Sequence, residues 1–266
     1  MTDGWWLETE CWKRATEVML PRFYVPDLDP AARQAALPED EGRHLTRVLR
    51  LGAGDEIAVF DGRGREFRAR VTLARRESVQ VDLLEPIASA PEPRVAMTLV
   101  QAVLKGDKMD AVVRDATMMG VAAVEPIITA RSAIRLGALE RGQAAQRWRR
   151  VAVSSAKQCR RATVPAIGDG QTLNDWLITD GAALKLLLVE PKAAGGDERS
   201  MRSLESASPP QSVSVLVGPE GGWSVEERRM AIDSGCTAVT LGGITLRADA
   251  VPVAALAIVR FVFGDL

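Results

Sequence analysis

The hydrophobic positions of this chain form two regions with different spacing. Between residues 22 and 84 the apolar runs are short, and within residues 66–73 apolar and polar side chains alternate. This alternation places Phe67, Ala69 and Val71 on one face of a strand and two arginines on the other. We therefore expect a small β domain with an arginine-rich surface. Its predicted strands lie near residues 22–25, 56–60, 65–73 and 78–84.

The spacing changes beyond residues 85–94, a segment with three prolines that we interpret as a linker. Further along, apolar runs typical of buried strands alternate with stretches of helical spacing. Such alternation predicts a parallel α/β sheet with helices on both faces. The predicted strands are 95–104, 123–129, 184–190, 213–218 and 238–242, and the predicted helices are 107–120, 139–161, one from 224, and 254–263. A long polar loop is expected over residues 192–211.

Several polar residues and glycines stand where helix ends are expected. Ser224 is followed three residues later by Glu227, which predicts a capping box and a helix that begins there. Asp107 and Gly120 are placed to begin and end the helix between them. Asp249 is placed to cap the last helix. These residues have structural interpretations that compete with functional ones.

The composition is that of a folded globular protein. Hydrophobic residues make up 47% and charged residues 26% of the 266 positions, and the formal net charge is −1. The balance argues against a protein that is basic throughout, but residues 44–76 carry eight arginines against four acidic residues. A local positive excess of this kind favours a polyanionic partner. An ordinary solvated face is the alternative.

Cysteine and histidine usage argues against metal chemistry. The three cysteines, Cys11, Cys159 and Cys236, lack CxxC spacing, so neither a disulfide framework nor a zinc site is predicted, and the single histidine is His44. Residues 1–20 mix charged residues into their apolar stretch, unlike a signal peptide, and we treat them as an extension. No run approaches the roughly 18 apolar residues of a membrane span. We expect a cytoplasmic protein without a metal or a membrane partner.

Three predicted strands end in glycine, proline or charged residues, at Glu190, at residues 217–222 and at residues 241–247. Ligands of parallel α/β sheets bind at the carboxyl ends of the strands, so these segments are candidate site loops. The sequence GPEGGW before Ser224 lacks the lysine and the spacing of a triphosphate-binding loop. A ligand-binding loop and a plain turn are both compatible with it.

Arg247 stands near the amino end of the last predicted helix. A cation is disfavoured there by the helix dipole, which favours a role in ligand binding. A salt bridge to Asp249 or Glu220 is the alternative.

Seven segments of the chain, in order, resemble one family of known enzymes. They are RFYVP (22–26), HLTRVLRLGAGDEI (44–57), FDGRG (60–64), VQAVLKGDKMD (100–110), KQCRR (157–161), LVGPEGGWSVEE (216–227) and LGGITLR (241–247). Together they resemble the bacterial 16S ribosomal RNA uridine-N3 methyltransferases of the SPOUT superfamily. The likeness extends over nearly all of the chain after its first twenty residues.

This resemblance implies a PUA-like β-barrel over residues 21–88 that helps to hold RNA, after an extension over residues 1–20. It implies an α/β domain over residues 95–266 with a parallel sheet and a C-terminal deep trefoil knot. The implied cofactor is S-adenosylmethionine and the implied substrate is 16S rRNA of the small ribosomal subunit. The implied assembly is a homodimer whose cofactor site lies near the dimer interface.

The resemblance also implies the residues of the site. The cofactor contacts fall on Leu188, Glu190, Val217, Gly218, Glu220, Gly221, Gly222, Leu241, Gly242, Ile244 and Leu246. The catalytic residues fall on Arg247, Asp249 and Glu220, with Arg247 stabilising negative charge on uracil and a carboxylate orienting the base or accepting its proton. The RNA contacts fall on Arg22, His44, Arg47, Arg50, Arg68 and on the helix-borne Arg160 and Arg161.

Two segments depart from the family pattern. Residues 246–251 read LRADAV where the pattern has LRTETA, so a shorter carboxylate replaces the usual one and both hydroxyls are lost. Met118 stands where the pattern has glutamate. These departures keep a second hypothesis open, in which the chain is a non-catalytic RNA-binding factor of ribosome assembly.

Overall fold

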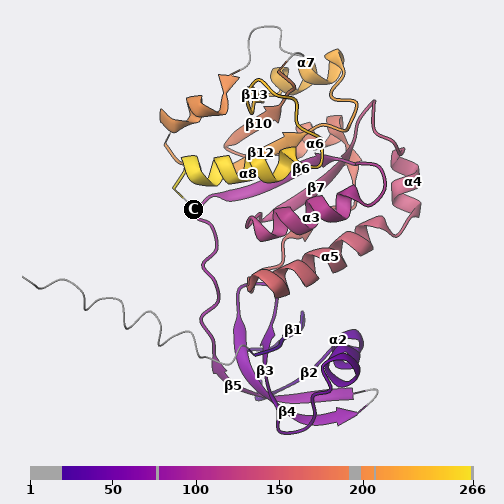
Figure 1. The fold of residues 1–266 in the computed structure, drawn as a ribbon, viewed down its shortest axis with the longest axis vertical. Coiled ribbons are helices and arrows are strands. Elements are labelled where there is room, and N and C mark those ends of the chain that lie inside the picture. The colour runs from indigo at the N-terminus through magenta and orange to yellow at the C-terminus, as the bar shows by residue number, and fades with distance from the viewer. Residues whose placement is uncertain (1–19, 76–77, 192–198, 207, 265–266) are drawn as a thin grey trace, which may run out of the picture. The chain divides into compact units, whose positions relative to one another are not determined.

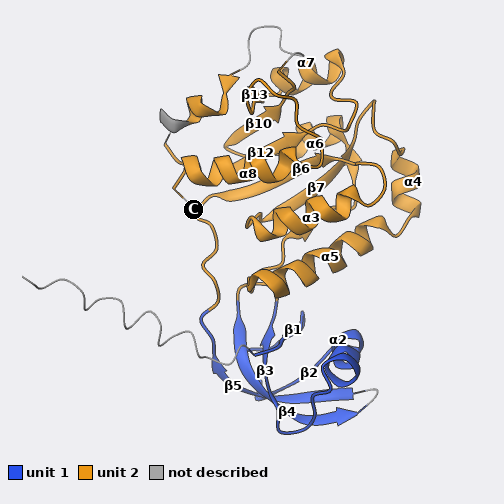
Figure 2. Ribbon diagram, viewed as in Figure 1, with its two compact units in different colours: residues 1–61, 65–88 blue, residues 62–64, 89–266 orange. Residues whose placement is uncertain are grey.

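The structure is a computed structural model that describes residues 20–75, 78–191, 199–206 and 208–264. The chain divides into two compact units, one of residues 1–61 and 65–88 and the other of residues 62–64 and 89–266 (Figure 2). Most of the predicted extension over residues 1–20 lies outside the described residues. Among the described helices, none is long and apolar enough to cross a membrane.

The first unit contains a five-stranded sheet in the order β1-β3-β4-β5-β2. Its strands are β1 (Arg22–Tyr24), β2 (Gln34–Ala36), β3 (Glu56–Phe60), β4 (Glu66–Arg75) and β5 (Ser78–Pro86). The pair β1 and β3 is parallel, and the other pairs are antiparallel. Four of the strands confirm the sequence prediction. β2 was missed because it is a three-residue strand at the edge of the sheet, without a buried residue to mark it.

The alternation along β4 is confirmed by burial. Ala69 and Val71 lie in the core of this unit and Phe67 packs against it. On the opposite face, Arg70 donates to Glu56 at 2.9 Å, and Arg68 lies within 3.2 Å of Glu85. Part of the expected positive surface is therefore balanced by neighbouring acids.

A short helix and a π-helix lie between β2 and β3, where only strand-like spacing was expected. They are α2 (Glu39–Arg43) and η2 (His44–Val48). Leu45 is the buried residue of the π-helix and joins the core of the unit. After the π-helix, Arg50 has φ 56°, a left-handed backbone conformation that residues other than glycine rarely adopt. Both features are uncommon, and both often occur at functional sites.

The second unit is built around an eight-stranded sheet in the order β11-β13-β10-β12-β6-β7-β8, with β9 paired to β7 (Figure 1). The strands are β6 (Ala96–Ala102), β7 (Ala123–Ile128), β8 (Ala166–Ile167), β9 (Gln171–Thr172), β10 (Leu184–Leu188), β11 (Arg199–Ser200), β12 (Ser212–Val217) and β13 (Thr237–Thr240). All of the recorded pairs are parallel, which confirms the predicted parallel α/β architecture.

Helices cover both faces of this sheet. They are α3 (Lys108–Met118), α4 (Leu136–Arg141), α5 (Ala144–Cys159), α6 (Leu173–Thr179), α7 (Val225–Asp233) and α8 (Val251–Val262). Leu186 and Leu188 of β10 pack into one core with α3, α5 and α8, whereas Leu187 packs into a second core with α6 and α7. This follows from the period of two along a strand, which turns successive side chains to opposite faces.

Two expectations about segments of this unit are wrong, and three of its elements were missed. The predicted helix 139–161 is two helices, because Gly142 adopts an extended conformation that ends α4. The predicted polar loop contains β11 and the 3₁₀ helix η3 (Met201–Ser206), and the apolar residues Met201 and Leu204 are buried within it. The elements β8, β9 and α6 were not predicted.

The helix ends mostly follow the sequence signals. Ser224 and Glu227 form the predicted capping box, with the Ser224 backbone N donating to Glu227 at 2.9 Å and the Glu227 backbone N donating to Ser224 at 3.1 Å. Gly120 has φ +82° directly after the C-cap of α3, as a glycine at that position allows. Asp107 is the N-cap residue of α3 but makes no side-chain cap hydrogen bond.

Candidate active site at the carboxyl ends of five strands

The three strand ends singled out in the sequence meet in space. Leu188 of β10 lies opposite Val217 of β12 on one side and Val239 of β13 on the other. The loops that follow these strands surround a pocket of about 290 Å³. The carboxyl ends of β6 and β7 lie in the same row, since β6 pairs in parallel with β12 and β7 pairs in parallel with β6. Five neighbouring strands therefore direct their carboxyl ends toward one region.

Nearly all residues predicted to contact the cofactor line this pocket. They are Leu188, Glu190, Val217, Gly218, Glu220, Gly221, Gly222, Leu241, Ile244 and Leu246. Gly242 lies outside the lining, and its carbonyl accepts a bond from the Thr240 hydroxyl at 3.1 Å. The predicted catalytic residues Arg247 and Asp249 also line the pocket.

The loop after β12 is held against the neighbouring strand by Trp223. The indole Nε1 of Trp223 donates to the Leu188 carbonyl at 2.9 Å, and the side chain is buried. A Cβ atom on Gly218 would lie 3.1 Å from that Nε1, so a larger residue there would push the indole away. Gly222 has φ +67°, a conformation that also favours glycine. The glycines thus allow a tight loop with its backbone facing the pocket.

The turn after β7 braces the same loop from another side. Glu227 Oε1 accepts from the Ala130 backbone N at 2.6 Å, and Arg131 Nη1 donates to the Gly221 carbonyl at 2.7 Å. Arg131 is exposed and lines the pocket. The other carboxylate oxygen of Glu227 accepts from the Ser224 backbone N. Both oxygens of Glu227 therefore have structural roles.

Glu220 forms an ion pair at the pocket. Its Oε1 accepts from Lys108 Nζ at 2.6 Å and from the Lys105 backbone N at 3.3 Å. Partial burial acts to raise the pKa of Glu220, but these hydrogen bonds and the Lys108 charge outweigh it, and the pKa is lowered. The carboxylate is therefore ionised at neutral pH and is a weak base.

Arg247 pairs with Asp249, which confirms one of the alternatives left open by the sequence. Arg247 Nε and Nη2 donate to the two carboxylate oxygens at 3.1 Å and 3.2 Å. Partial burial acts to raise the pKa of Asp249, and hydrogen bonds from its own backbone and from Arg247 lower it overall. The expected capping role of Asp249 is wrong, since Ala250 is the N-cap residue of α8 and no side-chain bond caps it.

Lys108 and Arg131 were not predicted as site residues. Lys108 begins α3 after β6, and Arg131 follows β7. Both strands were predicted, and a charged segment comes shortly after each, which is the signal that identified the other three strand ends. The sequence does not show that β6 and β7 lie beside β12 in the sheet, so the place of these two segments at the pocket could not be predicted. Arg228, also in the lining, was missed as well.

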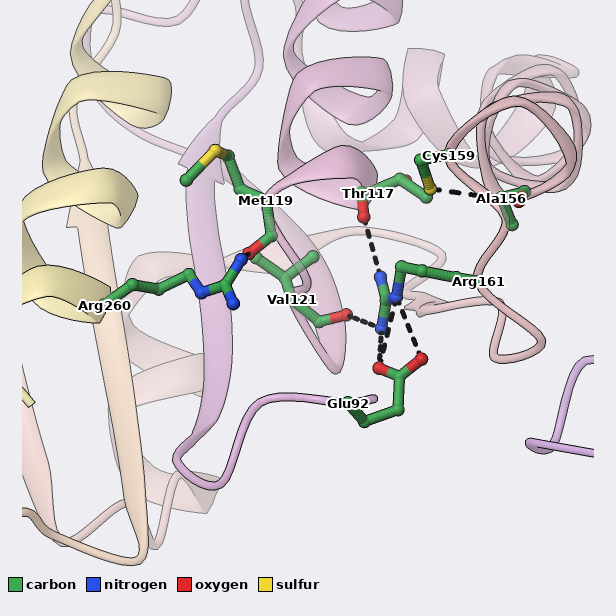
Figure 3. Close-up of polar contacts among 8 residues, drawn as sticks. All are labelled: Glu92, Thr117, Met119, Val121, Ala156, Cys159, Arg161 and Arg260. Carbon is green, nitrogen blue, oxygen red and sulfur yellow. Dashed lines mark hydrogen bonds and ion pairs between the residues drawn. The ribbon is translucent and has the colours of Figure 1, made fainter. Parts of the chain in front are cut away.

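Two predicted RNA contacts, Arg161 and Arg22, require correction because their guanidinium groups are buried. Arg161 donates to Glu92, to the Thr117 carbonyl at 2.8 Å and to the Val121 carbonyl at 3.1 Å (Figure 3). The side chain of Arg161 is 7% exposed. It also lies beyond α5, which ends at Cys159, so the expectation of a helix-borne residue is wrong.

Arg22 is held in the same manner in the first unit. Its Nε and Nη2 donate to the Glu66 carboxylate at 2.8 Å and 2.9 Å, and its guanidinium lies 4.6 Å from the centre of the Phe60 ring. The side chain is 6% exposed. The guanidinium groups of Arg22 and Arg161 are therefore occupied by contacts within the protein.

The other predicted RNA contacts have accessible side chains. His44, Arg47 and Arg50 are exposed on and just after the π-helix of the first unit, and Arg68 is partly exposed on β4. Arg160 is exposed at the C-cap of α5 in a left-handed conformation with φ 63°. As with Arg161, it lies beyond the helix that was expected to carry it.

Cysteine chemistry and metal binding find no support among the described residues. Burial raises the pKa of the Cys236 thiol to about 11, so it stays protonated and unreactive at neutral pH. Cys159 is also a free thiol, and Cys11 lies outside the described residues. Within the part of the chain that the structure describes, no group of three or more His, Cys, Asp or Glu side chains is arranged to hold a metal ion.

Comparison with known proteins identifies the family. Residues 91–260 match the family model of an RNA methyltransferase domain, and residues 37–84 match that of an RNA methyltransferase PUA domain. The ribosomal RNA small subunit methyltransferase E of Mycobacterium tuberculosis is 31% identical over 242 residues, which cover 88% of each chain. The chain belongs to the ribosomal RNA small subunit methyltransferase E family.

Two further members of the methyltransferase E family and one putative methyltransferase extend this likeness. The protein of that name from Synechocystis is 30% identical, over 90% of this chain and 77% of its own. A crystal structure of the Neisseria gonorrhoeae member bound to S-adenosyl methionine is 30% identical, has a TM-score of 0.80 and covers 92% of this chain and 98% of its own. A putative methyltransferase from Legionella pneumophila, in complex with the cofactor SAM, has a TM-score of 0.81 at 26% identity, with coverages of 92% and 98%.

Proposed function

We propose that this chain transfers the methyl group of S-adenosylmethionine to N3 of a uridine in 16S rRNA of the small ribosomal subunit. The observation that carries the proposal is the pocket at the adjoining ends of β10, β12 and β13, lined by ten of the eleven expected cofactor contacts. Membership of the methyltransferase E family and the S-adenosyl methionine in the N. gonorrhoeae structure support it. Together they favour an enzyme over a non-catalytic assembly factor.

The reaction requires positioning more than powerful acid–base chemistry. The uracil N3–H proton is released, the N3 electron pair forms a bond to the sulfonium methyl group, and the sulfur keeps the electrons of the broken S–CH₃ bond. A pocket that aligns the nitrogen, carbon and sulfur atoms lowers much of the barrier. The loop after β12 offers backbone groups beside Gly218 and Gly222, and the apolar chains of Leu188, Ile244 and Leu246 suit the adenosine and methionine parts.

We assign roles to the charged residues accordingly. Arg247 stabilises negative charge on the uracil ring, and Asp249 orients Arg247 through the two hydrogen bonds already described. Glu220 and Asp249 both have a lowered pKa, which supports orientation rather than proton acceptance for each. The N3 proton is then released to solvent.

RNA binding is proposed for the accessible arginines and for His44. In the first unit, phosphate groups contact His44, Arg47, Arg50 and Arg68, and in the second unit they contact Arg160. Contacts of this kind release counterions, so the affinity for RNA falls steeply as salt rises. An affinity that does not change between low and moderate salt contradicts this assignment.

The finer architecture is part of the same proposal. We assign residues 21–88 to a PUA-like β-barrel that binds RNA and residues 95–266 to a SPOUT-type domain with a C-terminal trefoil knot. The chain acts as a cytoplasmic homodimer without a metal. Ile244 is 81% exposed and Leu246 is 40% exposed beside the pocket, which supports coverage of this segment by the cofactor or by a second copy.

The test is methyl transfer from S-adenosylmethionine carrying a labelled methyl group to small subunits and to free 16S rRNA, both from cells that lack this protein. We expect label in one uridine of the 16S rRNA, located as N3-methyluridine by mass mapping, and binding of S-adenosylmethionine by calorimetry. A protein that binds RNA but neither binds the cofactor nor transfers label is the non-catalytic factor instead.

A further inference from the structure

Lys108 lies where a cation can act on the reacting base. It is the first residue of α3, directly after the segment that follows β6, and it lines the pocket with its side chain 34% exposed. Its ammonium is 2.6 Å from Glu220 Oε1. Asp249 lines the same pocket, and the Lys108 charge contributes to lowering its pKa. The ammonium therefore pairs with one acidic group proposed for the site and shares the pocket with the other.

The Lys108 ammonium is paired with a carboxylate of a braced loop. Glu220 belongs to the loop that Trp223 and Arg131 brace, and its Oε1 also accepts from the Lys105 backbone N at 3.3 Å. An ammonium has three N–H donors, and the contact with Glu220 uses one of them. The remaining donors are available for oxygens of a bound base.

Electrostatics explains why a lysine is needed at this position. A uracil that loses its N3 proton becomes an anion, and a nearby carboxylate of like charge disfavours that form. Glu220 would oppose the reaction unless a cation balanced it. Arg247 donates two of its N–H groups to Asp249, and its side chain is 76% exposed. Lys108 instead pairs directly with Glu220, so it is the cation that balances this carboxylate.

We propose that Lys108 is a catalytic residue, whose ammonium binds a carbonyl oxygen of the target uracil and stabilises the ring as the N3 proton is released to water. Glu220 is a positioning residue that directs the ammonium into the pocket. The N3–CH₃ bond then forms as the S–CH₃ bond breaks and the sulfur keeps its electron pair. This inference rests on the proposed uridine methylation and adds a residue and a charge balance to it.

The test compares Lys108→Met with Arg114→Met, each of which removes one positive charge from α3. Arg114 is exposed, pairs with its neighbour Asp115 and lies outside the pocket lining, so it is a matched control. Single-turnover methyl transfer is measured with saturating S-adenosylmethionine and small subunits between about pH 6 and 9, a range that approaches the pKa of a uracil imide. Calorimetry gives the Kd for S-adenosylmethionine, and thermal unfolding shows that each variant is folded.

We expect Lys108→Met to lower the rate at neutral pH about 100-fold, the typical effect of losing one group that stabilises developing negative charge. Its rate should rise with pH across the range and regain part of the loss, because hydroxide replaces the missing help with deprotonation. Lys108→Arg should restore part of the rate. The Kd of Lys108→Met for S-adenosylmethionine should match that of the wild type. Arg114→Met should match the wild type in both its rate and its Kd.

Two results overturn the role of Lys108. One is a wild-type rate and pH profile in Lys108→Met. The other is a Kd for S-adenosylmethionine that weakens by the same factor as the rate, which makes Lys108 a cofactor contact. If the wild type and Arg114→Met also transfer no methyl group to any 16S substrate, the proposed function itself fails, and that outcome is distinct from the other two.

Discussion

The two walls of the pocket are held very differently. The loop over residues 218–223 is bonded to three other strand ends, through Trp223 to β10, through Arg131 to the turn after β7, and through Glu220 to the segment after β6. In the segment over residues 241–250, the side-chain hydrogen bonds of the described residues are local, from Thr240 to Gly242 and from Arg247 to Asp249. Ile244 there is 81% exposed.

This difference indicates that the two walls have different roles in binding. The braced wall is held by hydrogen bonds to three other strand ends, and we propose that its backbone groups bind the cofactor. The exposed wall has apolar side chains without cover in the single chain, and we propose that the cofactor or a second copy completes it. Substitutions on each wall test whether the two walls differ in this way.

Trp223→Ala should have the largest effect on stability. It removes a buried indole and leaves the Leu188 carbonyl without its 2.9 Å donor, so we expect the free energy of unfolding to fall by about 3 to 5 kcal/mol. Binding of S-adenosylmethionine should be lost as the loop loosens. Denaturant unfolding and calorimetry measure both effects. Trp223→Phe is the matched control, since it keeps most of the volume and should lose about 1 kcal/mol. Equal losses in the two variants contradict the bracing role of the indole volume.

Glu227→Ala should destabilise the same wall by a smaller amount. It removes the carboxylate half of the α7 capping box and leaves the Ala130 backbone N without its acceptor, with an expected loss of about 2 to 3 kcal/mol. The control is Glu226→Ala, which changes an exposed carboxylate in the same first turn. If the two variants unfold at the same denaturant concentration, the contact between α7 and the turn after β7 is not important for stability.

Glu220 should make a modest contribution that depends on pH. Its pKa is lower in the folded protein than in the unfolded chain, so its stabilising effect is present above the unfolded pKa of about 4.3 and disappears as pH falls through the folded value. In Glu220→Gln, the fall in Tm on acidification from about pH 5 to pH 3 should therefore be shallower than in the wild type. Parallel curves for the two proteins, measured by thermal unfolding, contradict the lowered pKa.

Ile244→Ala should leave stability almost unchanged, within about 0.5 kcal/mol, because the side chain is exposed. Its effect should instead be on the cofactor, with a Kd for S-adenosylmethionine about tenfold weaker from the loss of apolar contact. Ile178→Ala is the control, since Ile178 is 74% exposed on α6, outside the pocket lining. A loss of stability in Ile244→Ala without a change in Kd means that the exposed wall is structural.

The sequence predicted most of the strands and three of the five loops around the site, because these signals are local. The capping box of Ser224 and Glu227 lies within one helical turn. What was missed depends on residues far apart in the chain. Lys108 meets Glu220 across 112 positions and Arg131 meets Gly221 across 90, and nothing in either segment names its partner.

The corrected RNA contacts failed for the same physical reason. Arginine is usually a surface residue, so the sequence alone predicts that it is exposed. Its burial depends on a partner that lies far away in the sequence. Arg22 is paired with Glu66 over 44 positions and Arg161 with Glu92 over 69. The π-helix at residues 44–48 was missed because its hydrophobic spacing is not separable from that of short strands in a segment of this length.

The order of the strands has a consequence for how the chain folds during synthesis. β6 lies in the middle of the sheet between β7 and β12, and Ala96 of β6 pairs with Ser212 of β12. One side of β6 therefore stays unpaired until the chain beyond residue 212 has left the ribosome. An unpaired apolar strand edge is a site of aggregation, and pairings this distant form slowly. We expect this protein to depend on chaperones or on slow synthesis more than a protein whose neighbouring strands are consecutive.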